Sequence, residues 1–593
     1  MSKSHRRQQR RSSPVSRRAL FSIAGASAGV AAGAAGLAAW RLRDRTESGG
    51  TSSAPETSAA PESTAEPTLD VAAREAWVDS AMSGMSLETK VGQLFMVYAY
   101  GDSSSGSAHA GSNQGLHGVD NPAQLFADYR VGGIIYFDWT DNLLDPAQIA
   151  ELSAGIHQAS LEHTGVQALI GVDQEHGPIT RIGEPVTTLP GAMALGASGE
   201  ASVAEESARI CGTELRAMGI NLDFAPVADV NVNPANPVIG LRSFSSDPDL
   251  AAEMVAAQVR GFQPLDDGIA ACAKHFPGHG DTDVDSHVGL PVITHSEDEW
   301  RSIDLPPFQS AIGAEVDLIM SAHLQFPALD DSGTPATLSQ PILTGLLRDE
   351  LGFEGAITTD ALNMEGVRVQ HSDAEIPVLA LQAGVDLLLM PQDLPTAYQA
   401  VLDAVADGTL TEDRIDASVR RLLRIRYHRG FAGDPPNPEE VSAVGTDEHA
   451  AAAASLFERT VVVERGGELL PIGPGAAVAV EGPDGSAVDT LVQALTDEGL
   501  NPTAWGSAGD SDFAVVLCED AGEWSDQMGR VRSAAESGTP TAAVSTGKPY
   551  DVAYFPDGVA AMATCSSAAP AMRALAGVLA GRVEAASGLP VEI

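Results

Sequence analysis

The densest group of chemically reactive side chains lies in residues 274–287, which read KHFPGHGDTDVDSH. These fourteen residues hold three His, three Asp and one Lys, and they follow an apolar run. Asp285 stands two residues before His287, a spacing at which side chains of an extended segment share one face. A carboxylate bonded to one ring nitrogen fixes the tautomer of a histidine and stabilises its protonated form. We therefore predict that His287 gives and takes a proton, with Asp285 as its partner.

The same loop must also be weighed as a metal site. Asp281, Asp283 and Asp285 imitate the opening of a calcium-binding loop. The sixth position of that template is Ser286 instead of Gly, and the twelfth is Val292 instead of Glu, so the calcium template fails. A zinc site of His and Asp ligands stays open as an alternative, as does a solvated loop without chemistry.

A second candidate is Asp360, which ends the apolar stretch AITTDAL of residues 356–362. A carboxylate at the end of a buried strand can attack an anomeric carbon and form a glycosyl-enzyme. Aspartate is also a good helix N-cap, so Asp360 could instead begin the next helix. The sequence pattern alone favours neither interpretation.

Short apolar runs that end at polar or turn residues recur along the chain and would position these groups. Eight such runs occupy residues 92–97, 132–137, 168–173, 222–227, 270–276, 317–323, 355–360 and 386–391. Helix-like segments such as residues 201–218 separate them. Eight strands alternating with helices predict a (β/α)8 barrel, with a doubly wound open sheet as the alternative. Barrel chemistry lies where strands end, which here are Asp173, Lys274, His275, His323 and Asp360.

A second region begins near residue 446 and has its own strand pattern. Its apolar runs are residues 476–480, 513–518, 541–545 and 561–565. They predict a smaller α/β sandwich domain with a parallel sheet and without a glycine-rich phosphate loop. The predicted order is an export signal (1–45), a linker (46–72), the barrel (73–433), a second linker (434–445) and the C-terminal domain (446–593).

The N-terminal residues have the layout of an export signal. A basic stretch ends in the paired Arg17-Arg18, and an apolar run of small residues follows over 19–40. Paired arginines before such a run indicate the twin-arginine route. The run is long enough to span a bilayer, but it is rich in Gly and Ala and would tether the chain only loosely. We expect an extracellular or envelope-associated protein.

The charge balance and the cysteine count exclude several classes. Residues after 45 hold 25 basic and 79 acidic side chains, a net charge of −54. Such a surface argues against a nucleic-acid partner, which requires clustered basic residues. Four cysteines in 593 residues do not form a disulfide scaffold. We expect a monomer that uses neither a metal nor an organic cofactor.

The motifs together resemble glycoside hydrolase family 3, in its β-N-acetylglucosaminidase branch. The most specific match is KHFPGHG followed by Asp285-Ser286-His287, and the resemblance runs from residue 85 to the end. Further matching stretches are Asp173-Gln174-Glu175, Phe224-Ala225-Pro226-Val227, Arg242-Ser243-Phe244, Met320-Ser321-Ala322-His323, Thr359-Asp360 and Lys548-Pro549-Tyr550-Asp551. The resemblance implies a catalytic barrel followed by a smaller α/β domain.

The resemblance also implies roles for individual residues. Asp360 would be the nucleophile and His287 the acid/base, supported by Asp285. Sugar-binding residues would be Asp173, Arg181, Arg242, Lys274 and His275, with Met364 lining the pocket. The substrate would be a terminal β-linked N-acetylglucosamine of peptidoglycan fragments or chitin oligomers. A phosphorylase and a β-glucosidase of the same family are the alternatives.

One stretch departs from the family pattern. The usual run Asp-Gln-Glu-Gly-Gly-Arg-Val-x-Arg has His176 in place of a Gly and Pro178 in place of an Arg. The two sugar-binding ends, Asp173 and Arg181, are retained. Because the turn between them differs, the position of Arg181 depends on a local geometry that the family pattern does not give.

Overall fold

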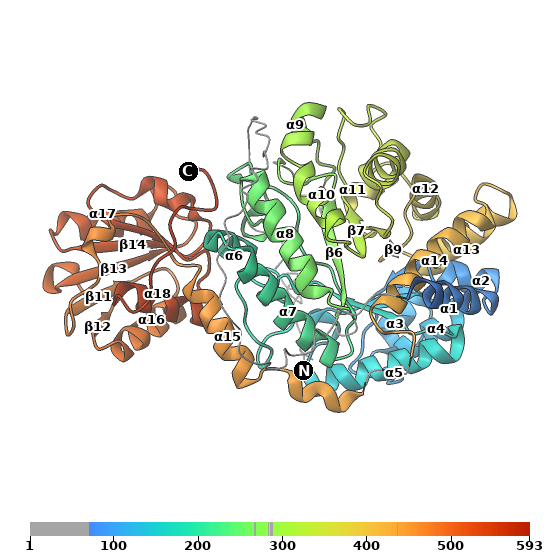
Figure 1. The fold of residues 1–593 in the computed structure, drawn as a ribbon, viewed down its shortest axis with the longest axis horizontal. Coiled ribbons are helices and arrows are strands. Elements are labelled where there is room, and N and C mark those ends of the chain that lie inside the picture. Colours follow the sequence, from blue (N-terminus) through green and yellow to red (C-terminus); the bar gives the residue numbers. More distant parts are fainter. Residues whose placement is uncertain (1–69, 266–267, 283, 285–288, 434, 436) are drawn as a thin grey trace, which may run out of the picture.

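The computed structural model describes residues 70–265, 268–282, 284, 289–433, 435 and 437–593. The described chain forms two lobes, a larger barrel and a smaller C-terminal lobe beside it (Figure 1). Helix α15 (Asp447–Glu458) begins the part of the chain that enters the smaller lobe. The 3₁₀ helix Pro438–Ala443 precedes α15, within the residues predicted to link the domains.

The larger lobe is a barrel of eight parallel strands, one inside each predicted run. In the order of the sheet they are β8 (Ala356–Thr359), β7 (Leu318–Ser321), β6 (Ala270–Phe276), β5 (Leu222–Asp223), β4 (Leu169–Val172), β3 (Gly133–Ile135), β2 (Phe95–Val97) and β9 (Leu388–Leu389). A parallel bridge between Thr358 and Leu387 joins β8 to the chain entering β9. The Thr359 amide also donates to the Leu387 carbonyl at 3.0 Å. This closure confirms the barrel, and the open-sheet alternative is wrong.

Helices surround the barrel and follow clear local signals. Asn121, Asp145 and Asp247 each accept a hydrogen bond from a first-turn amide, and each precedes a Pro at the first helical position. This combination satisfies orphan amides and presets the helical φ angle. The outer helices are α1 (Val71–Ser83), α2 (Leu87–Gly92), α3 (Ala110–His117), α4 (Pro122–Tyr129), α5 (Pro146–Thr164), α7 (Ala201–Ala217), α8 (Pro248–Phe262), α9 (Glu297–Ser302), α10 (Leu305–Gly313), a π-helix (Pro341–Glu350), α11 (Glu365–Arg368), α12 (Glu375–Ala383), α13 (Leu394–Ala406) and α14 (Glu412–His428).

A buried arginine fastens the last helix of the barrel to its strands. Arg426 of α14 is 1% exposed and donates to the carbonyls of Gln167 and Gly132, at 2.7 and 2.8 Å. It also donates to the Gln93 side chain at 3.1 Å. A buried cation needs such partners, because an unpaired one would be strongly destabilising. These bonds connect α14 to the segments that enter β2, β3 and β4.

The C-terminal lobe is built on a six-stranded mixed sheet. Its order is β10 (Val462–Arg465), β15 (Ala560–Ala563), β14 (Thr541–Ser545), β13 (Phe513–Cys518), β11 (Ala477–Glu481) and β12 (Asn501–Ala504). The prediction of a purely parallel sheet is wrong, because β10 pairs antiparallel with β15 at one edge. The edge strand β12 escaped prediction because it contains Pro502 and few apolar residues, a composition that edge strands tolerate.

Helices cover both faces of this sheet, and one of them comes from the barrel. Helices α15, α16 (Gly485–Asp497) and α18 (Ala569–Leu579) share the apolar cluster on one face. The other face packs against α17 (Asp526–Glu536) and against α6 (Ala192–Ser198), a barrel helix that contributes Met193, Ala194 and Ala197. The two lobes therefore share part of one apolar core.

Two further expectations concern cysteines and membranes. All four cysteines are buried free thiols, which agrees with the prediction that the chain has no disulfide framework. Within the described part of the chain, no helix has both the length and the apolar character needed to cross a bilayer. The predicted tether, residues 19–40, lies outside the described residues.

The contact of α6 with the barrel loops generates a stability prediction. A Cβ atom at Gly196 would stand 1.8 Å from the Phe244 carbonyl oxygen, so Gly196→Ala must displace backbone. We expect a loss of about 1–3 kcal/mol, as for other overpacked sites, measured as a lower melting temperature. The control is Gly111→Ala on α3, where a Cβ meets nothing within 4 Å. Equal melting temperatures for the two variants would contradict this packing.

Candidate active site

A cavity of about 200 Å³ opens at the carboxyl ends of the barrel strands. Every predicted site residue that the structure describes lines it: Asp173, Arg181, Arg242, Lys274, His275, Asp360 and Met364. These residues come from the carboxyl-terminal part of β6 and from the connections after β4, β5 and β8, so the barrel topology is what brings them together. The predicted dyad of Asp285 and His287 lies outside the described residues.

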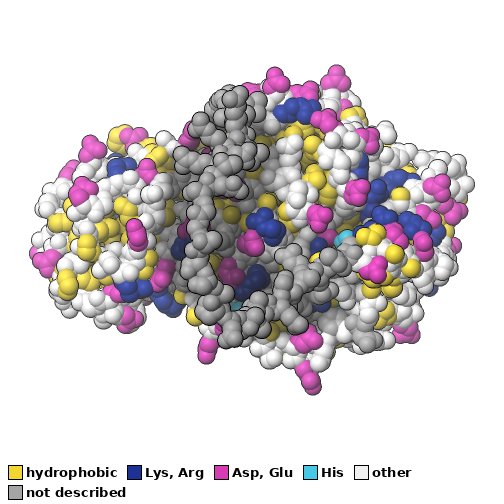
Figure 2. Space-filling view, viewed as in Figure 1, with side chains coloured by type: hydrophobic (Ala, Val, Ile, Leu, Met, Phe, Trp, Pro, Cys, Tyr) yellow, Lys and Arg dark blue, Asp and Glu magenta, His cyan; other side chains and the backbone are white. Residues whose placement is uncertain are grey.

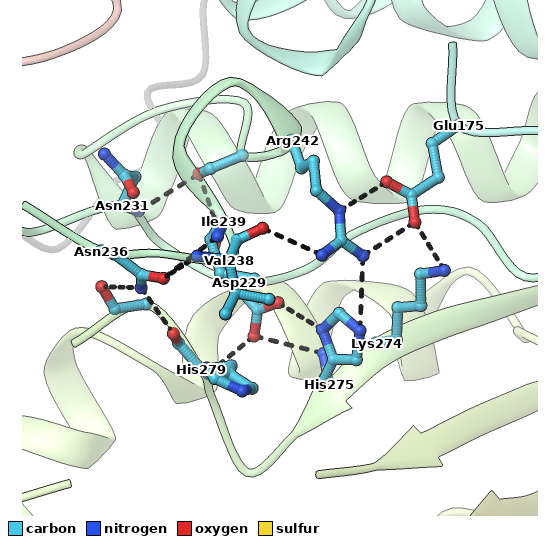
Figure 3. Close-up of polar contacts among 12 residues, drawn as sticks. Glu175, Asp229, Asn231, Asn236, Val238, Ile239, Arg242, Lys274, His275 and His279 are labelled. Carbon is cyan, nitrogen blue, oxygen red and sulfur yellow. Dashed lines mark hydrogen bonds and ion pairs between the residues drawn. The ribbon is translucent and has the colours of Figure 1, made fainter. Parts of the chain in front are cut away.

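The most buried charges of the cavity form one cluster around Glu175 (Figure 3). Arg242 binds this carboxylate through two nitrogens, Nε at 2.8 Å and Nη2 at 2.9 Å. The Lys274 ammonium lies 2.6 Å from Glu175 Oε1. Burial alone would raise the pKa of Glu175, but Arg242 and Lys274 hold it well below its usual range. Glu175 is therefore an anion that neutralises two buried cations.

Asp173 is the more exposed carboxylate of the site. Its side chain is 18% exposed, against 5% for Glu175, and it accepts from Lys274 Nζ at 2.9 Å. Arg181 Nη2 approaches its second oxygen at 3.7 Å. Burial alone would lower the pKa of Lys274, but Asp173 and Glu175 raise it above its usual range. The ammonium thus stays charged at the cavity wall.

The departure from the family pattern does not remove Arg181 from the site. His176 and Gly177 both adopt φ near +60°, and a short antiparallel bridge joins His176 to Ile179. Gln174 closes the turn, because its Oε1 accepts from the amides of Arg181 and Ile182 at 2.9 and 3.0 Å. Arg181 Nε is buried and has no hydrogen-bond partner among the described residues. The changed turn thus leaves Arg181 in the cavity lining.

His275 is oriented by a buried carboxylate that follows β5. Its Nδ1 lies 2.7 Å from Asp229 Oδ2, and the other Asp229 oxygen accepts from the amides of His275 and His279, at 3.2 and 2.7 Å (Figure 3). Burial alone would raise the pKa of Asp229, but His275 and His279 lower it. Nδ1 therefore donates to the carboxylate, and Nε2 lies on the side of Arg242, 3.5 Å from Nη2.

Asp360 stands directly after β8, with its carboxylate held by its own backbone. Oδ1 accepts from the Ala361 amide at 2.7 Å, and the Asp360 amide donates to the Ser321 carbonyl of β7 at 3.2 Å. The next helix, α11, begins at Glu365 and has Met364 in the N-cap position. The helix-cap alternative for Asp360 is therefore wrong.

One predicted strand-end residue has a supporting position. His323 is fully buried and is not part of the cavity lining. Its Nδ1 contacts Thr337 Oγ1 at 2.8 Å, and its Nε2 lies 3.1 Å from the Ala361 carbonyl. It therefore holds the turn that follows Asp360.

Sequence reasoning missed several residues of the site. Glu175 binds the predicted Arg242 and Lys274, Asp229 binds the predicted His275, and Phe137 and Trp139 line the cavity. Glu175 could have been found, because it stands two residues after Asp173 at the end of the same strand. Asp229 and Trp139 lie in irregular connections, for which apolar periodicity gives no signal.

A buried charged triad holds the chain on both sides of the predicted acid/base residues. His295 Nδ1 lies 2.7 Å from Asp304 Oδ2, and His295 Nε2 lies 3.1 Å from Asp281 Oδ2. Burial alone would lower the pKa of His295, but the two carboxylates raise it to about 10. Asp281 precedes the undescribed residues 285–288 and His295 follows them, so the triad fixes both ends of that connection.

This triad predicts a pH-dependent contribution to stability. The pKa of an unfolded histidine is about 6.5, so the raised value near 10 stabilises the fold fully below pH 6.5. The contribution is lost as the pH rises toward 10. We expect His295→Gln to lower the melting temperature most at pH 6 and least near pH 10. The control is His163→Gln on α5, a partly exposed position at which the melting temperature should not change. If His295→Gln lowered the melting temperature by the same amount at every pH, a charged His295 between the two carboxylates would be contradicted.

Comparisons with known proteins agree with this geometry. Residues 86–425 match the model of the glycosyl hydrolase family 3 N-terminal domain. Beta-hexosaminidase A of Pseudoalteromonas piscicida is 33% identical over 460 residues, which cover 72% of this chain and 75% of the relative. A protein of Cellulomonas fimi called beta-N-acetylglucosaminidase/beta-glucosidase is 27% identical, over 87% of this chain and 95% of its own length.

A solved structure matches both lobes. The glycoside hydrolase family 3 beta-N-acetylglucosaminidase from Paenibacillus sp. str. FPU-7 is 36% identical and has a TM-score of 0.71. The match covers 86% of this chain and 99% of that structure. With the family model spanning more than half of the sequence and the barrel-end cavity in place, this chain belongs to glycoside hydrolase family 3.

Proposed function

We propose that the protein is a retaining exo-β-N-acetylglucosaminidase that removes one terminal sugar at a time. The observation that carries the proposal is the cavity of about 200 Å³ whose lining includes both Asp360 and a cluster of hydrogen-bonding charges. Its volume lies below the roughly 300–1,000 Å³ of sites for drug-sized ligands, and it suits one pyranose ring. The β-hexosaminidase and β-N-acetylglucosaminidase names of the relatives support the choice of sugar.

Sugar recognition follows from the donors and acceptors around the cavity. Asp173 has the exposure to accept hydrogen bonds from a pair of hydroxyls, while Lys274 and Arg181 donate to hydroxyl oxygens. Arg181 Nη2 and Asp173 Oδ2 both belong to residues of the cavity lining and lie 3.7 Å apart, too far for a hydrogen bond, so each can pair with a sugar hydroxyl.

The chemistry proceeds in two steps. Asp360 attacks the anomeric carbon as the bond from that carbon to the leaving oxygen breaks, and His287 gives its proton to that oxygen. The neutral His287, oriented by Asp285, then takes a proton from water, whose oxygen displaces Asp360 from the sugar. Two inversions leave the configuration retained. The roles of Asp285 and His287 rest on their spacing and on the family resemblance.

Two related activities, phosphorolysis and β-glucoside hydrolysis, are alternatives that the nitrophenol-release assay described below also tests. Imidazole is neutral once it has given up its proton, so an anionic acceptor is repelled less than by a carboxylate base. Phosphate could then replace water and give a sugar 1-phosphate. The Cellulomonas fimi relative is also called a β-glucosidase. The assay therefore includes a nitrophenyl β-glucoside beside the N-acetylglucosaminide.

We further propose that the enzyme works outside the cytoplasm on peptidoglycan fragments or chitin oligomers. The paired Arg17-Arg18 and the apolar run over 19–40 support export by the twin-arginine route. The acidic surface argues against a nucleic-acid partner, and Figure 2 shows acidic side chains spread over both lobes of the face in view.

The assignment of Asp360 predicts the behaviour of Asp360→Asn. Without a nucleophilic carboxylate, release of nitrophenol from the β-N-acetylglucosaminide should fall by about 10³-fold or more, with an unchanged melting temperature. The control is Asp557→Asn, an exposed residue of the smaller lobe. A variant that keeps a tenth of the activity would exclude Asp360 as nucleophile. Formation of sugar 1-phosphate by the wild type in phosphate would assign a phosphorylase.

The Glu175 cluster predicts a second effect. In Glu175→Gln, Lys274 and Arg242 lose their shared anion, and Lys274 keeps only Asp173 as a carboxylate partner. We expect kcat/KM to fall by about 10²-fold, the cost of misplacing active-site groups by about 1 Å. Glu184→Gln, at an exposed position of the same connection, is the matched control. Equal kcat/KM for the two variants would show that the cluster does not support catalysis.

A further inference from the structure

We infer that Trp139 forms a platform for the sugar ring on the leaving-group side of the scissile bond. This inference rests on the proposed function and names the residue that recognises the leaving pyranose of its substrates. It adds a second sugar-binding position to the site. Trp139, which forms this position, belongs neither to the charged cluster nor to the predicted catalytic residues.

The first observation is that the cavity has room for one ring while its lining continues to the surface. Trp139 lines the cavity and is nevertheless 41% exposed. Among the large apolar side chains exposed in the described chain, Trp139 alone belongs to the cavity lining. It therefore stands at the rim, where the group attached to the bound sugar must leave the cavity.

The second observation is that neighbouring aromatic rings hold the Trp139 ring in place. Phe137 is stacked on it, with centroids 4.9 Å apart and planes 24° apart. Tyr98 and Tyr100 meet it edge-on, at 4.9 and 5.8 Å. Such contacts stabilise a defined ring orientation, so little side-chain freedom is lost when a ligand binds.

Hydrogen bonds fix the short connection that carries this ring, the 3₁₀ helix Asp138–Thr140. The Thr140 hydroxyl donates to the Phe137 carbonyl at 2.7 Å. The side-chain Nδ2 of Asn142 donates to the carbonyls of Ala99 and Gly101, at 3.1 and 2.8 Å. The connections after β2 and β3 are thereby joined, and the platform is part of a rigid rim.

The chemistry of an indole face selects a sugar ring. A β-linked pyranose presents a flat face of C–H groups with its hydroxyls at the edges, and this face stacks on an aromatic ring through apolar burial and weak C–H contacts. A methyl leaving group is too small to cover the indole. A flexible alkyl chain could reach it but would lose conformational freedom on binding.

The test compares leaving groups in Trp139→Ala. Hydrolysis of N,N′-diacetylchitobiose and of methyl β-N-acetylglucosaminide is measured for each variant. Nitrophenyl glycosides are not used in this comparison, because the nitrophenyl group is aromatic and would itself stack on the indole. We expect kcat/KM for the disaccharide to fall about tenfold more than kcat/KM for the methyl glycoside, the effect of losing one well-packed aromatic contact. Trp139→Phe should retain most of the preference. Trp524→Ala, which removes an 83% exposed tryptophan of the smaller lobe, should change neither value.

Other outcomes overturn the inference. An equal fall for both substrates would place Trp139 in the first sugar site, and an equal or larger fall for octyl β-N-acetylglucosaminide would make it a general apolar contact. If the wild type cleaves no N-acetylglucosaminide, the proposed function fails, and tryptophan fluorescence then tests the platform separately. Diacetylchitobiose should quench the wild type more than N-acetylglucosamine does, and this difference should vanish in Trp139→Phe; equal quenching by the two sugars would overturn the inference.

Discussion

The site depends on one buried carboxylate that two cations share. Glu175 lies between Lys274 and Arg242, which belong to different connections of the barrel. Each of these charges would be costly in the interior alone, and a shared anion makes their burial tolerable. The more exposed Asp173 and Arg181 lie beside this cluster. A structural ion pair thus supports the groups that we propose to bind the sugar.

The order of the strands in the barrel explains why these groups lie close together. β4 leads to Asp173 and Glu175, the connection after β5 leads to Asp229 and Arg242, and β6 carries Lys274 and His275. These three strands are neighbours in the sheet, so charges that are about 100 residues apart in sequence lie within hydrogen-bond distance. Asp360 comes from β8, two strands further along the sheet. The charged cluster and Asp360 therefore line one cavity, although they come from different parts of the barrel.

Much of this arrangement could be predicted because it depends on periodic burial. Barrel strands are buried on both faces and appear in the sequence as apolar runs, and their polar endings mark the site. The position of Glu175 could have been predicted, because it follows Asp173 by two residues, but its role depends on two partners distant in sequence. The edge strand β12 and the antiparallel β10 escaped prediction because edge strands need less apolar character. The turn at His176 brings Arg181 back through Gln174, a hydrogen-bond arrangement that residue spacing does not reveal.

The central claim is that Asp360 forms a covalent bond with the sugar. The most direct measurement is mass spectrometry of the enzyme after reaction with a 5-fluoro-N-acetylglucosaminyl fluoride, which slows the second step more than the first. The account predicts one added sugar mass on the intact protein and, after digestion, on the peptide that contains Asp360. A label on another carboxylate would contradict the account, as would an inverted product formed without any label.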